Sequence, residues 1–397
     1  MAYEYPPYYF GGIGSFSKDL SLALSSAGIK LTVIAFSHHR MITKENVNAN
    51  LTVIRVPTLN FPPRHLWWQT CNRNLIVNLL SKLAPDLIHS NNLVASLPLQ
   101  TVKKALDIPQ IVTIHGDNKK ILEIILKNTK LLHLQDFLTY VCFEPLYEKL
   151  LQKEMETVDC AVAVSCHLKN DISDRFKTAN IKSVYNGFDL GIFLGNRNTS
   201  EVTESAIVTG GSQKKNVRIA YAGRLYWIKG VTYALKAFAV LMRLPGLRNV
   251  ELNIYGDGPL RTTVKKFAER SQRSACKVHY FGVLPRAQFL IELFNSDIVI
   301  FPSLYEACPM ALFEALSLGK AVVVSNMPWS KEFIEHKVNG LRVDTRDPET
   351  FAESLFELII DNELRERVSK NASRAIEKYS MSNTVSNYMN IYKNLVK

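Results

Sequence analysis

Apolar runs of strand length alternate with segments of helical periodicity along most of the chain. The predicted strands cover residues 31–36, 51–56, 87–89, 111–114, 160–165, 183–185, 218–222, 251–255, 278–281, 298–301 and 321–325. Most runs are apolar at consecutive positions, which is typical of parallel strands covered by helices on both faces. Helical patterns lie between them, at residues such as 15–27, 231–242, 261–273, 309–318 and 348–361. The alternation predicts an α/β fold with doubly wound parallel sheets.

The alternation is interrupted once, by a polar stretch over residues 194–216 that contains a Gly-Gly pair. This composition predicts a linker between two Rossmann-like domains, because the strand–helix order starts again after it. The expected boundaries are residues 1–195 for the first domain, 196–216 for the linker and 217–376 for the second domain. Residues 377–397 have a helical apolar pattern. We expect this last helix, kinked near its start, to pack back on the first domain.

The composition narrows the class of protein. Apolar residues make up 47% of the 397 residues and charged residues 21%, which excludes global disorder. The 48 basic and 36 acidic residues give a net charge of +12, which favours nucleotides, phosphorylated sugars, acidic lipids or nucleic acid as partners. The sequence has no long Lys/Arg block and no RNA-binding fingerprint, so we do not expect a nucleic-acid partner.

The spacing of the cysteines and the length of the apolar runs indicate the cellular compartment of the protein. The six cysteines form no CxxC pair, so a zinc site or a disulfide framework is not expected. No apolar run reaches 18 residues, and the first residues lack the basic and apolar regions of a signal peptide. These features predict a cytoplasmic protein.

Two cations bracket the loop that follows the predicted strand 218–222. Arg224 comes just after this strand, and Lys229 comes just before the next predicted helix. Ligands of open α/β sheets bind at the carboxyl ends of the strands, so both cations can reach one diphosphate there. The alternative is a pair of solvated loop cations.

Two acidic residues follow the predicted strand 298–301. Glu306 precedes a helix, and Glu314 lies inside it in an otherwise apolar segment. A carboxylate there either lies at the water-facing edge of the helix or accepts the hydroxyls of a ribose or hexose. The free amides of Met310 and Ala311, in the first turn of the helix, can meet a phosphate. This is the most specific signal in the chain.

Five further positions are candidates with open alternatives. Gly12 belongs to a glycine loop before a helix, although its spacing is not that of a dinucleotide fingerprint. His115 ends an apolar strand and either faces the ligand edge or is structural. Asn186 and Asp189 form a turn signal between the domains, where Asp189 can also cap a helix. Gly256 allows a flat base to approach closely or forms a tight turn.

These motifs, in this order, resemble the retaining nucleotide-sugar glycosyltransferases of the GT-B fold, family GT4. The resemblance covers nearly the whole chain, and its most specific part is the Glu-x7-Glu pair with an upstream Arg and Lys. It implies two Rossmann-like domains that face a deep cleft. The second domain would bind the nucleotide-sugar donor, and the first would bind a glycan or lipid-linked acceptor.

The resemblance also implies roles for individual residues. Arg224 and Lys229 would neutralise the donor diphosphate as it leaves, and Gly256 belongs to the same donor site. Glu314 would bind the ribose hydroxyls, and Glu306 would contact the donor hexose near its anomeric carbon.

In the first domain, His115 would lie beside the transferred sugar, and Gly12 would line the diphosphate side of the cleft. Many glycosyltransferases of another fold use an Asp-x-Asp motif to hold a metal, and this chain has no such motif. No metal or other cofactor is therefore expected, and retention would proceed by substitution on one face of the sugar, without a protein nucleophile.

Three alternatives remain at the level of the sequence. A glycogen-synthase-like glucan extender and a sugar epimerase share the architecture, and a catalytically silent sugar-nucleotide binding protein would keep part of the motif set. The family pattern also differs at two places. Ala307 and Cys308 replace a common Gly and Phe. Only residues 1–3 precede the glycine loop as a first strand, which predicts exposed edges on its neighbours and suggests a truncated start.

Residues 61–73 combine two tryptophans with three basic side chains. Trp and Arg together suit a lipid headgroup region, which predicts a peripheral contact with an anionic membrane at its inner, cytoplasmic face. The alternative is a loop of the acceptor domain packed on its own core.

Overall fold

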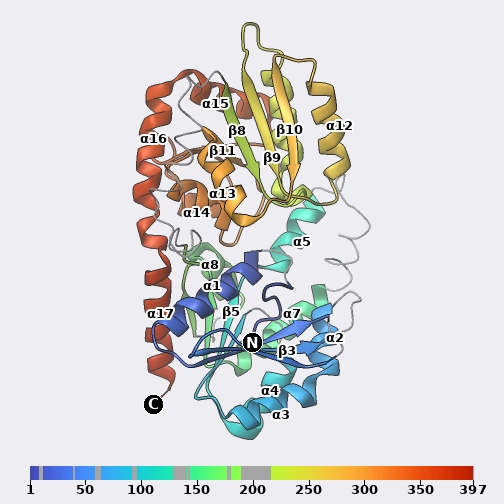
Figure 1. Cartoon of the computed structure of the whole chain (residues 1–397), viewed down its shortest axis with the longest axis vertical. Helices are drawn as coiled ribbons and strands as arrows, with labels where there is room; N and C mark the ends of the chain where they lie inside the picture. Colours follow the sequence, from blue (N-terminus) through green and yellow to red (C-terminus); the bar gives the residue numbers. More distant parts are fainter. Residues whose placement is uncertain are drawn as a thin grey trace. The chain divides into compact units, whose positions relative to one another are not determined.

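The computed structural model describes residues 1–8, 12–38, 41–58, 64–91, 96–127, 141, 144–176, 180–188 and 216–396, with the side chains of 64–66 and 96–97 left out. The chain divides into two compact units (Figure 1). The first unit comprises Met1–Gly187 and Tyr379–Lys397, and the second comprises Phe188–Lys378. Each unit is an α/β structure, as predicted. Most of the predicted linker, residues 196–215, lies outside the described residues.

The second unit is built on one parallel sheet with the strand order β10-β9-β8-β11-β12-β13. The strands are β8 (Val217–Ala222), β9 (Val250–Tyr255), β10 (Cys276–Gly282), β11 (Ile298–Phe301), β12 (Ala321–Ser325) and β13 (Leu341–Val343). This is the doubly wound Rossmann order, and the direction of winding reverses between β8 and β11. All but the short β13 were predicted from their apolar runs.

Helices surround this sheet, and some of them form a hydrophobic core with it. They are α11 (Val231–Leu241), α12 (Arg261–Ser271), α13 (Arg286–Phe294), α14 (Met310–Ser317), α15 (Pro348–Ile360) and α16 (Asn362–Ala375). The core joins sheet residues such as Ile219 and Leu252 to helix residues such as Phe238 and Leu355. Local signals set the ends: α15 begins with Pro348, and the Asp347 side chain accepts the amide of Glu349.

The first unit has two hydrogen-bonded groups of strands. One has the order β1-β3-β2 and the other β4-β5-β6-β7. The strands are β1 (Leu31–Ser37), β2 (Thr43–Asn46), β3 (Leu51–Pro57), β4 (Ile88–Asn91), β5 (Gln110–Ile114), β6 (Cys160–Ala163) and β7 (Ile181–Ser183). Among the strands described in this unit, only the exposed, polar β2 pairs antiparallel, and its composition gave no strand signal.

Residues 1–3 run between these two groups of strands. The Ala2 amide donates to the Ile34 carbonyl over 3.0 Å, and the Asn91 amide donates to the Met1 carbonyl over 2.8 Å. The edges of β1 and β4 beside this segment were expected to be exposed. That expectation is wrong at these positions, because even three residues of extended chain satisfy the backbone groups on both sides.

The helices of the first unit are α1 (Gly12–Ser26), α2 (Arg64–Cys71), α3 (Arg73–Leu83), α4 (Ser96–Leu106), α5 (Asn118–Lys127), α7 (Glu144–Thr157) and α8 (Cys166–Ser173). Helix α17 (Met381–Leu395) joins them from the far end of the sequence (Figure 1). Its Tyr388 and Ile391 pack with Phe16 and Leu20 of α1. A short 3-10 turn, Glu377–Tyr379, separates α17 from α16, where the kink was predicted. In the part of the chain that the structure describes, no helix is long and apolar enough to cross a membrane.

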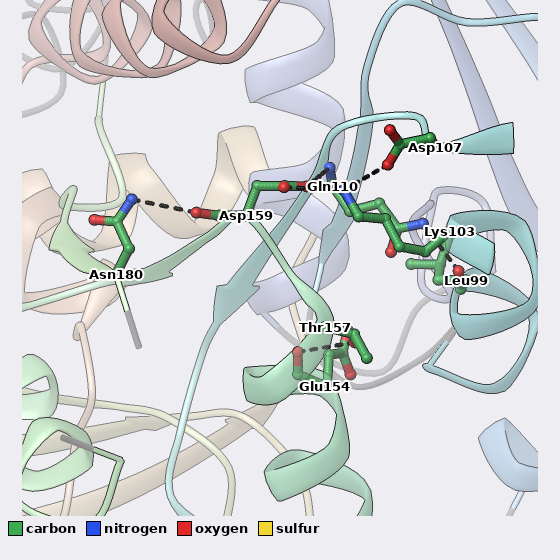
Figure 2. Close-up of polar contacts among 8 residues, drawn as sticks. All are labelled: Leu99, Lys103, Asp107, Gln110, Glu154, Thr157, Asp159 and Asn180. Carbon is green, nitrogen blue, oxygen red and sulfur yellow. Dashed lines mark hydrogen bonds and ion pairs between the residues drawn. The ribbon is translucent and has the colours of Figure 1, made fainter. Parts of the chain in front are cut away.

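A polar cluster lies at the amino ends of β5 and β6 in the first unit (Figure 2). The ammonium group of Lys103 on α4 donates to both carboxylate oxygens of Asp159, over 2.9 and 2.8 Å. The backbone N–H group of Gln110 donates to the same carboxylate over 2.8 Å. Asn180 donates to the Asp159 carbonyl over 3.2 Å. The cluster ties a helix to three neighbouring strand ends.

Candidate active site

The candidate residues of the second unit gather at the carboxyl ends of its central strands. Arg224 and Lys229 follow β8, Gly256 follows β9, and Glu306 follows β11. Strands β8 and β11 are neighbours and flank the point where the winding reverses. Open α/β sheets bind ligands in the crevice outside this point, so the fold brings the predicted residues to the expected place.

The loop from β8 to α11 carries both cations, and Tyr221 supports it from below. The buried Tyr221 hydroxyl lies 3.0 Å from the Arg224 carbonyl and 3.3 Å from the Lys229 carbonyl. Burial raises the pKa of Tyr221, so the hydroxyl keeps its proton and donates it. Sequence reasoning missed this residue, because an apolar strand with one tyrosine carries no sign of a loop contact.

Two glycines allow this loop to approach the neighbouring strands. Gly256 has φ +128°, and a Cβ on it would lie 1.9 Å from the Gly223 carbonyl oxygen. Gly230 has φ +71°, and its Cβ would lie 2.0 Å from the Pro302 carbonyl oxygen. Any side chain at either position would push the cation loop away from the sheet. Gly256 therefore has a close-approach role within the protein itself.

Lys229 and Glu306 form an ion pair in this loop cluster. The Lys229 ammonium donates to Glu306 Oε1 over 2.7 Å, and the Ser303 hydroxyl donates to the same oxygen over 2.8 Å. The two charged side chains are 29% and 14% exposed, so both remain within reach of a ligand. Ser303 holds the carboxylate independently of the lysine.

Arg224 is exposed at the start of the same loop, and its guanidinium lies 5.7 Å from the centre of the Tyr226 ring. The ring limits the directions that the side chain can take while leaving its charge open to solvent. Arg224 and Lys229 thus place two positive charges at the end of β8.

Glu314 lies on α14, and its side chain is only 3% exposed. The water-facing alternative for this residue is therefore wrong. Its carboxylate forms an ion pair with Arg286, the first residue of α13. A buried carboxylate needs such a partner to stay ionised. Sequence reasoning missed Arg286, although an arginine in the first turn of a helix is itself unusual.

Met310 and Ala311 form the first turn of α14, as predicted. Pro309 precedes them, and it makes no side-chain capping bond to the turn. The first intrahelical bonds come from the Leu312 and Phe313 amides, which donate to the Pro309 carbonyl. The backbone N–H groups of Met310 and Ala311 point out of the helix end, where an anion can accept hydrogen bonds from them.

His115 and Gly12 belong to the first unit. His115 follows β5, its Nε2 atom is buried, and its ring packs edge-on against Phe16 at 5.3 Å. Burial lowers the pKa of His115 to about 3, so the ring is neutral near pH 7. Gly12 is the exposed first residue of α1.

Asn186 is buried next to the point where the chain leaves the first unit. The adjacent Gly187 packs on the start of α17, and a Cβ there would lie 2.5 Å from the Met381 Cα atom. Asp189 lies outside the described residues. Among those that the structure describes, no group of three or more His, Cys, Asp or Glu side chains is arranged to hold a metal ion.

Both halves of the chain match models of known families. Residues 10–191 match the family described as Glycosyltransferase Family 4. Residues 203–375 match the family described as Glycosyl transferases group 1. The second match contains Arg224, Lys229, Glu306 and Glu314.

Individual proteins are similar over nearly the whole length. An uncharacterized glycosyltransferase of Methanocaldococcus jannaschii is 26% identical over 400 residues, which covers 99% of this chain and 97% of that protein. The sucrose-phosphate synthase of Thermosynechococcus elongatus has a similar structure, with a TM-score of 0.78, 14% identity and coverage of 97% and 94%. The Anabaena protein HepE, solved with UDP, has a TM-score of 0.68, 18% identity and coverage of 97% and 98%.

Proposed function

Because the chain belongs to the group 1 glycosyltransferases and has the GT-B fold of two Rossmann-like units, we propose a specific reaction for it. The enzyme moves a hexose from a nucleoside-diphosphate sugar to a hydroxyl group of a sugar or lipid-linked acceptor. The anomeric configuration is retained, and no metal ion takes part. The observation that carries this proposal is the pairing of Lys229 with Glu306 beside Arg224, at the switch point of the second unit.

The two cations stabilise the leaving group. When the bond between the anomeric carbon and the β-phosphate oxygen breaks, the sugar gains positive charge and the diphosphate gains negative charge. Arg224 offers a planar fork and Lys229 a point charge to these oxygens. The amides of Met310 and Ala311 add two neutral donors. Fixed donors aimed at the developing charge make the largest contribution to such a reaction.

Lys229 interacts first with the Glu306 carboxylate and then with the donor diphosphate. It is paired with Glu306, and a diphosphate at the end of β8 competes for the same ammonium group. Ser303 holds the Glu306 carboxylate in place when Lys229 turns to the phosphate. Glu306 is then free to accept hexose hydroxyls near the anomeric carbon.

The acceptor hydroxyl attacks on the face from which the diphosphate leaves. Its proton passes to the departing phosphate oxygen, so no protein base and no protein nucleophile is required. His115 stays neutral through this step and hydrogen-bonds a sugar hydroxyl, because burial keeps its pKa near 3. Glu314 accepts the ribose hydroxyls of the donor.

The donor is tested by thermal shift with UDP-, GDP- and ADP-sugars, followed by a transfer assay with the sugar that raises the melting temperature most. A selective stabiliser that also supports transfer identifies the donor. Activity that is unchanged by EDTA supports the metal-independent mechanism, and a large loss contradicts it. The absence of both binding and transfer with every donor would overturn the proposal.

Product analysis separates the proposed enzyme from two alternatives. A glucan extender lengthens one polymer repeatedly, whereas the proposed enzyme adds one hexose to a defined acceptor. A silent binding protein is stabilised by the donor but yields neither transfer nor hydrolysis. The intact set of Arg224, Lys229, Glu306 and Glu314 favours an active enzyme over a silent one.

The proposal includes a contact between the first unit and a membrane that carries a lipid-linked acceptor. Trp67 on α2 is 38% exposed and Leu83 at the end of α3 is 40% exposed, and Arg73 and Lys82 are exposed beside them in sequence. Aromatic and basic side chains together favour a headgroup region, at the cytoplasmic face of a membrane. The protein should sediment with anionic phospholipid vesicles at low salt and be released at high salt. Equal binding to neutral vesicles would contradict this contact.

A further inference from the structure

We propose that Arg286 is a positioning residue for Glu314, and that this pair, rather than Glu314 alone, makes the enzyme prefer ribose over 2′-deoxyribose in its donor. The inference rests on the proposed function, since it concerns the nucleoside of the same donor. Arg286 of α13 and Glu314 of α14 form an ion pair, and no motif in the sequence predicts it.

The burial of the two partners is unequal. The Glu314 side chain is 3% exposed and that of Arg286 is 34% exposed, although the Arg286 Nε and Nη2 atoms are themselves buried. The neighbours of Glu314 along α14, including Phe313 and Ala315, are apolar and buried. Without the guanidinium, the carboxylate would lose its ion-pair partner in a poorly solvated site, which raises the cost of its negative charge.

The position of Arg286 opposes local helix preferences. It is the first residue of α13, where the helix dipole favours an anion and disfavours a cation. No acidic residue lies in this first turn. A residue that violates a local rule and gains a specific tertiary partner is the usual sign of a functional position.

Helix α13, which begins with Arg286, is fixed to the rest of the unit at two further points near its last turn. The Tyr255 hydroxyl at the end of β9 donates to Glu292, two residues before the end of the helix, over 3.1 Å. The Lys320 ammonium donates to the Phe294 carbonyl at the last residue of the helix. The guanidinium therefore approaches α14 from a fixed base, at the edge of the sheet that carries the other candidate residues.

The chemistry of the pair sets the expected selectivity. A carboxylate offers about four lone-pair sites. The Arg286 guanidinium uses a lone-pair site on Glu314 Oε1. The remaining lone-pair sites of the carboxylate can accept hydrogen bonds from two vicinal hydroxyls. A 2′-deoxyribose lacks one of these donors, so the wild type should bind it more weakly by about 10- to 100-fold, as expected for one hydrogen bond to a charged group.

The experiment measures two dissociation constants by calorimetry. The probes are the nucleoside diphosphate among UDP, GDP and ADP that stabilises the wild type most, and its 2′-deoxy counterpart. In Arg286→Met and Arg286→Gln, Glu314 protonates or turns away, and the preference for ribose should fall to about 3-fold or less. Arg286→Lys, which restores the charge without the fork, should recover part of it. Arg346→Met removes the arginine of an exposed pair in the same unit and should leave the ratio unchanged.

A second comparison isolates the coupling. In a Glu314→Gln background, Arg286→Met should change the affinity for the ribonucleotide by less than about 2-fold, because the residue through which it acts is gone. Wild-type ribose preference in both neutral Arg286 variants, with only the melting temperature lowered, would overturn the inference and leave the proposed function standing. Failure of the wild type to bind any of the three diphosphates would overturn both.

Discussion

Two lysine–carboxylate pairs of nearly equal length lie at opposite ends of parallel strands, one in each unit. Lys103 and Asp159 meet over 2.8 Å at the amino ends of β5 and β6 in the first unit (Figure 2). Lys229 and Glu306 meet over 2.7 Å at the carboxyl ends of β8 and β11 in the second. The lysine side chains are similarly exposed, at 24% and 29%, whereas the Asp159 and Glu306 side chains are 32% and 14% exposed.

The pairs differ in what surrounds them. Asp159 also accepts the Gln110 amide, and its backbone carbonyl accepts Asn180, so this cluster joins strand ends to α4. In the part of the chain that the structure describes, Glu306 also accepts the Ser303 hydroxyl, and Lys229 lies in a loop shaped by close-approach glycines. An ion pair does not reveal its role by its length. Its place on the sheet and the backbone around it do.

The largest effect is expected for Lys229→Ala. Removing one charge that stabilises the leaving diphosphate should lower turnover by about 100- to 1,000-fold while leaving the fold intact. Steady-state transfer rates and a thermal melt of the same sample measure both quantities. Turnover within about 3-fold of the wild type would show that Lys229 does not stabilise the leaving group. Lys229 and Lys103 would then not differ in function.

The glycine contacts of the second unit give the next largest effect. Gly256→Ala places a methyl group against the Gly223 carbonyl at a backbone conformation that alanine avoids, and should lower the free energy of unfolding by about 3 kcal/mol. The matched control is Gly246→Ala, because Gly246 also has a positive φ of +81° but nothing within 4 Å of its Cβ. It should cost about 1 kcal/mol. Equal losses in the two variants, measured by urea unfolding, would contradict the close-approach argument.

A change of pH should affect the first unit through two half-buried histidines, His89 in β4 and His115 after β5. Burial lowers the pKa values of His89 and His115 to about 3, whereas the unfolded chain has values near 6.5. The unfolded state therefore binds more protons between these values, and the free energy of unfolding should fall as pH drops from 6.5 toward 4. The slope is at most about 1.4 kcal/mol per pH unit for each histidine. In His115→Asn, the free energy of unfolding should fall less steeply with pH. An unchanged slope would show that the His115 ring is exposed to solvent in the wild type.

The smallest effect is expected for Lys103→Ala. The loss of a partly exposed pair should cost about 1 kcal/mol of stability, and Asp159 keeps the Gln110 amide as a partner. Transfer rates should remain those of the wild type. A loss of turnover like that of Lys229→Ala, at equal stability, would show that the amino-end cluster also serves the reaction.

Much of the fold follows from local patterns. The consecutive apolar runs predicted β8, β9, β11 and β12 within one or two residues, and the helical pattern over 348–361 predicted α15. The pattern failed where burial is low. The exposed strand β2 lacks apolar residues, and helix α16 has only one narrow apolar stripe, Leu364, Val368 and Ala372, among charged residues.

The chain itself determined which residue types follow each strand: the cations after β8, the acids after β11 and the glycines between them. Only the tertiary structure decided which of these charges meet. Arg286 reaches Glu314, Tyr221 supports the cation loop, and residues 1–3 complete the pairing of two strand edges. The physical reason is that periodicity and caps are local properties, whereas an ion pair or a buried hydroxyl depends on which helices and strands pack together.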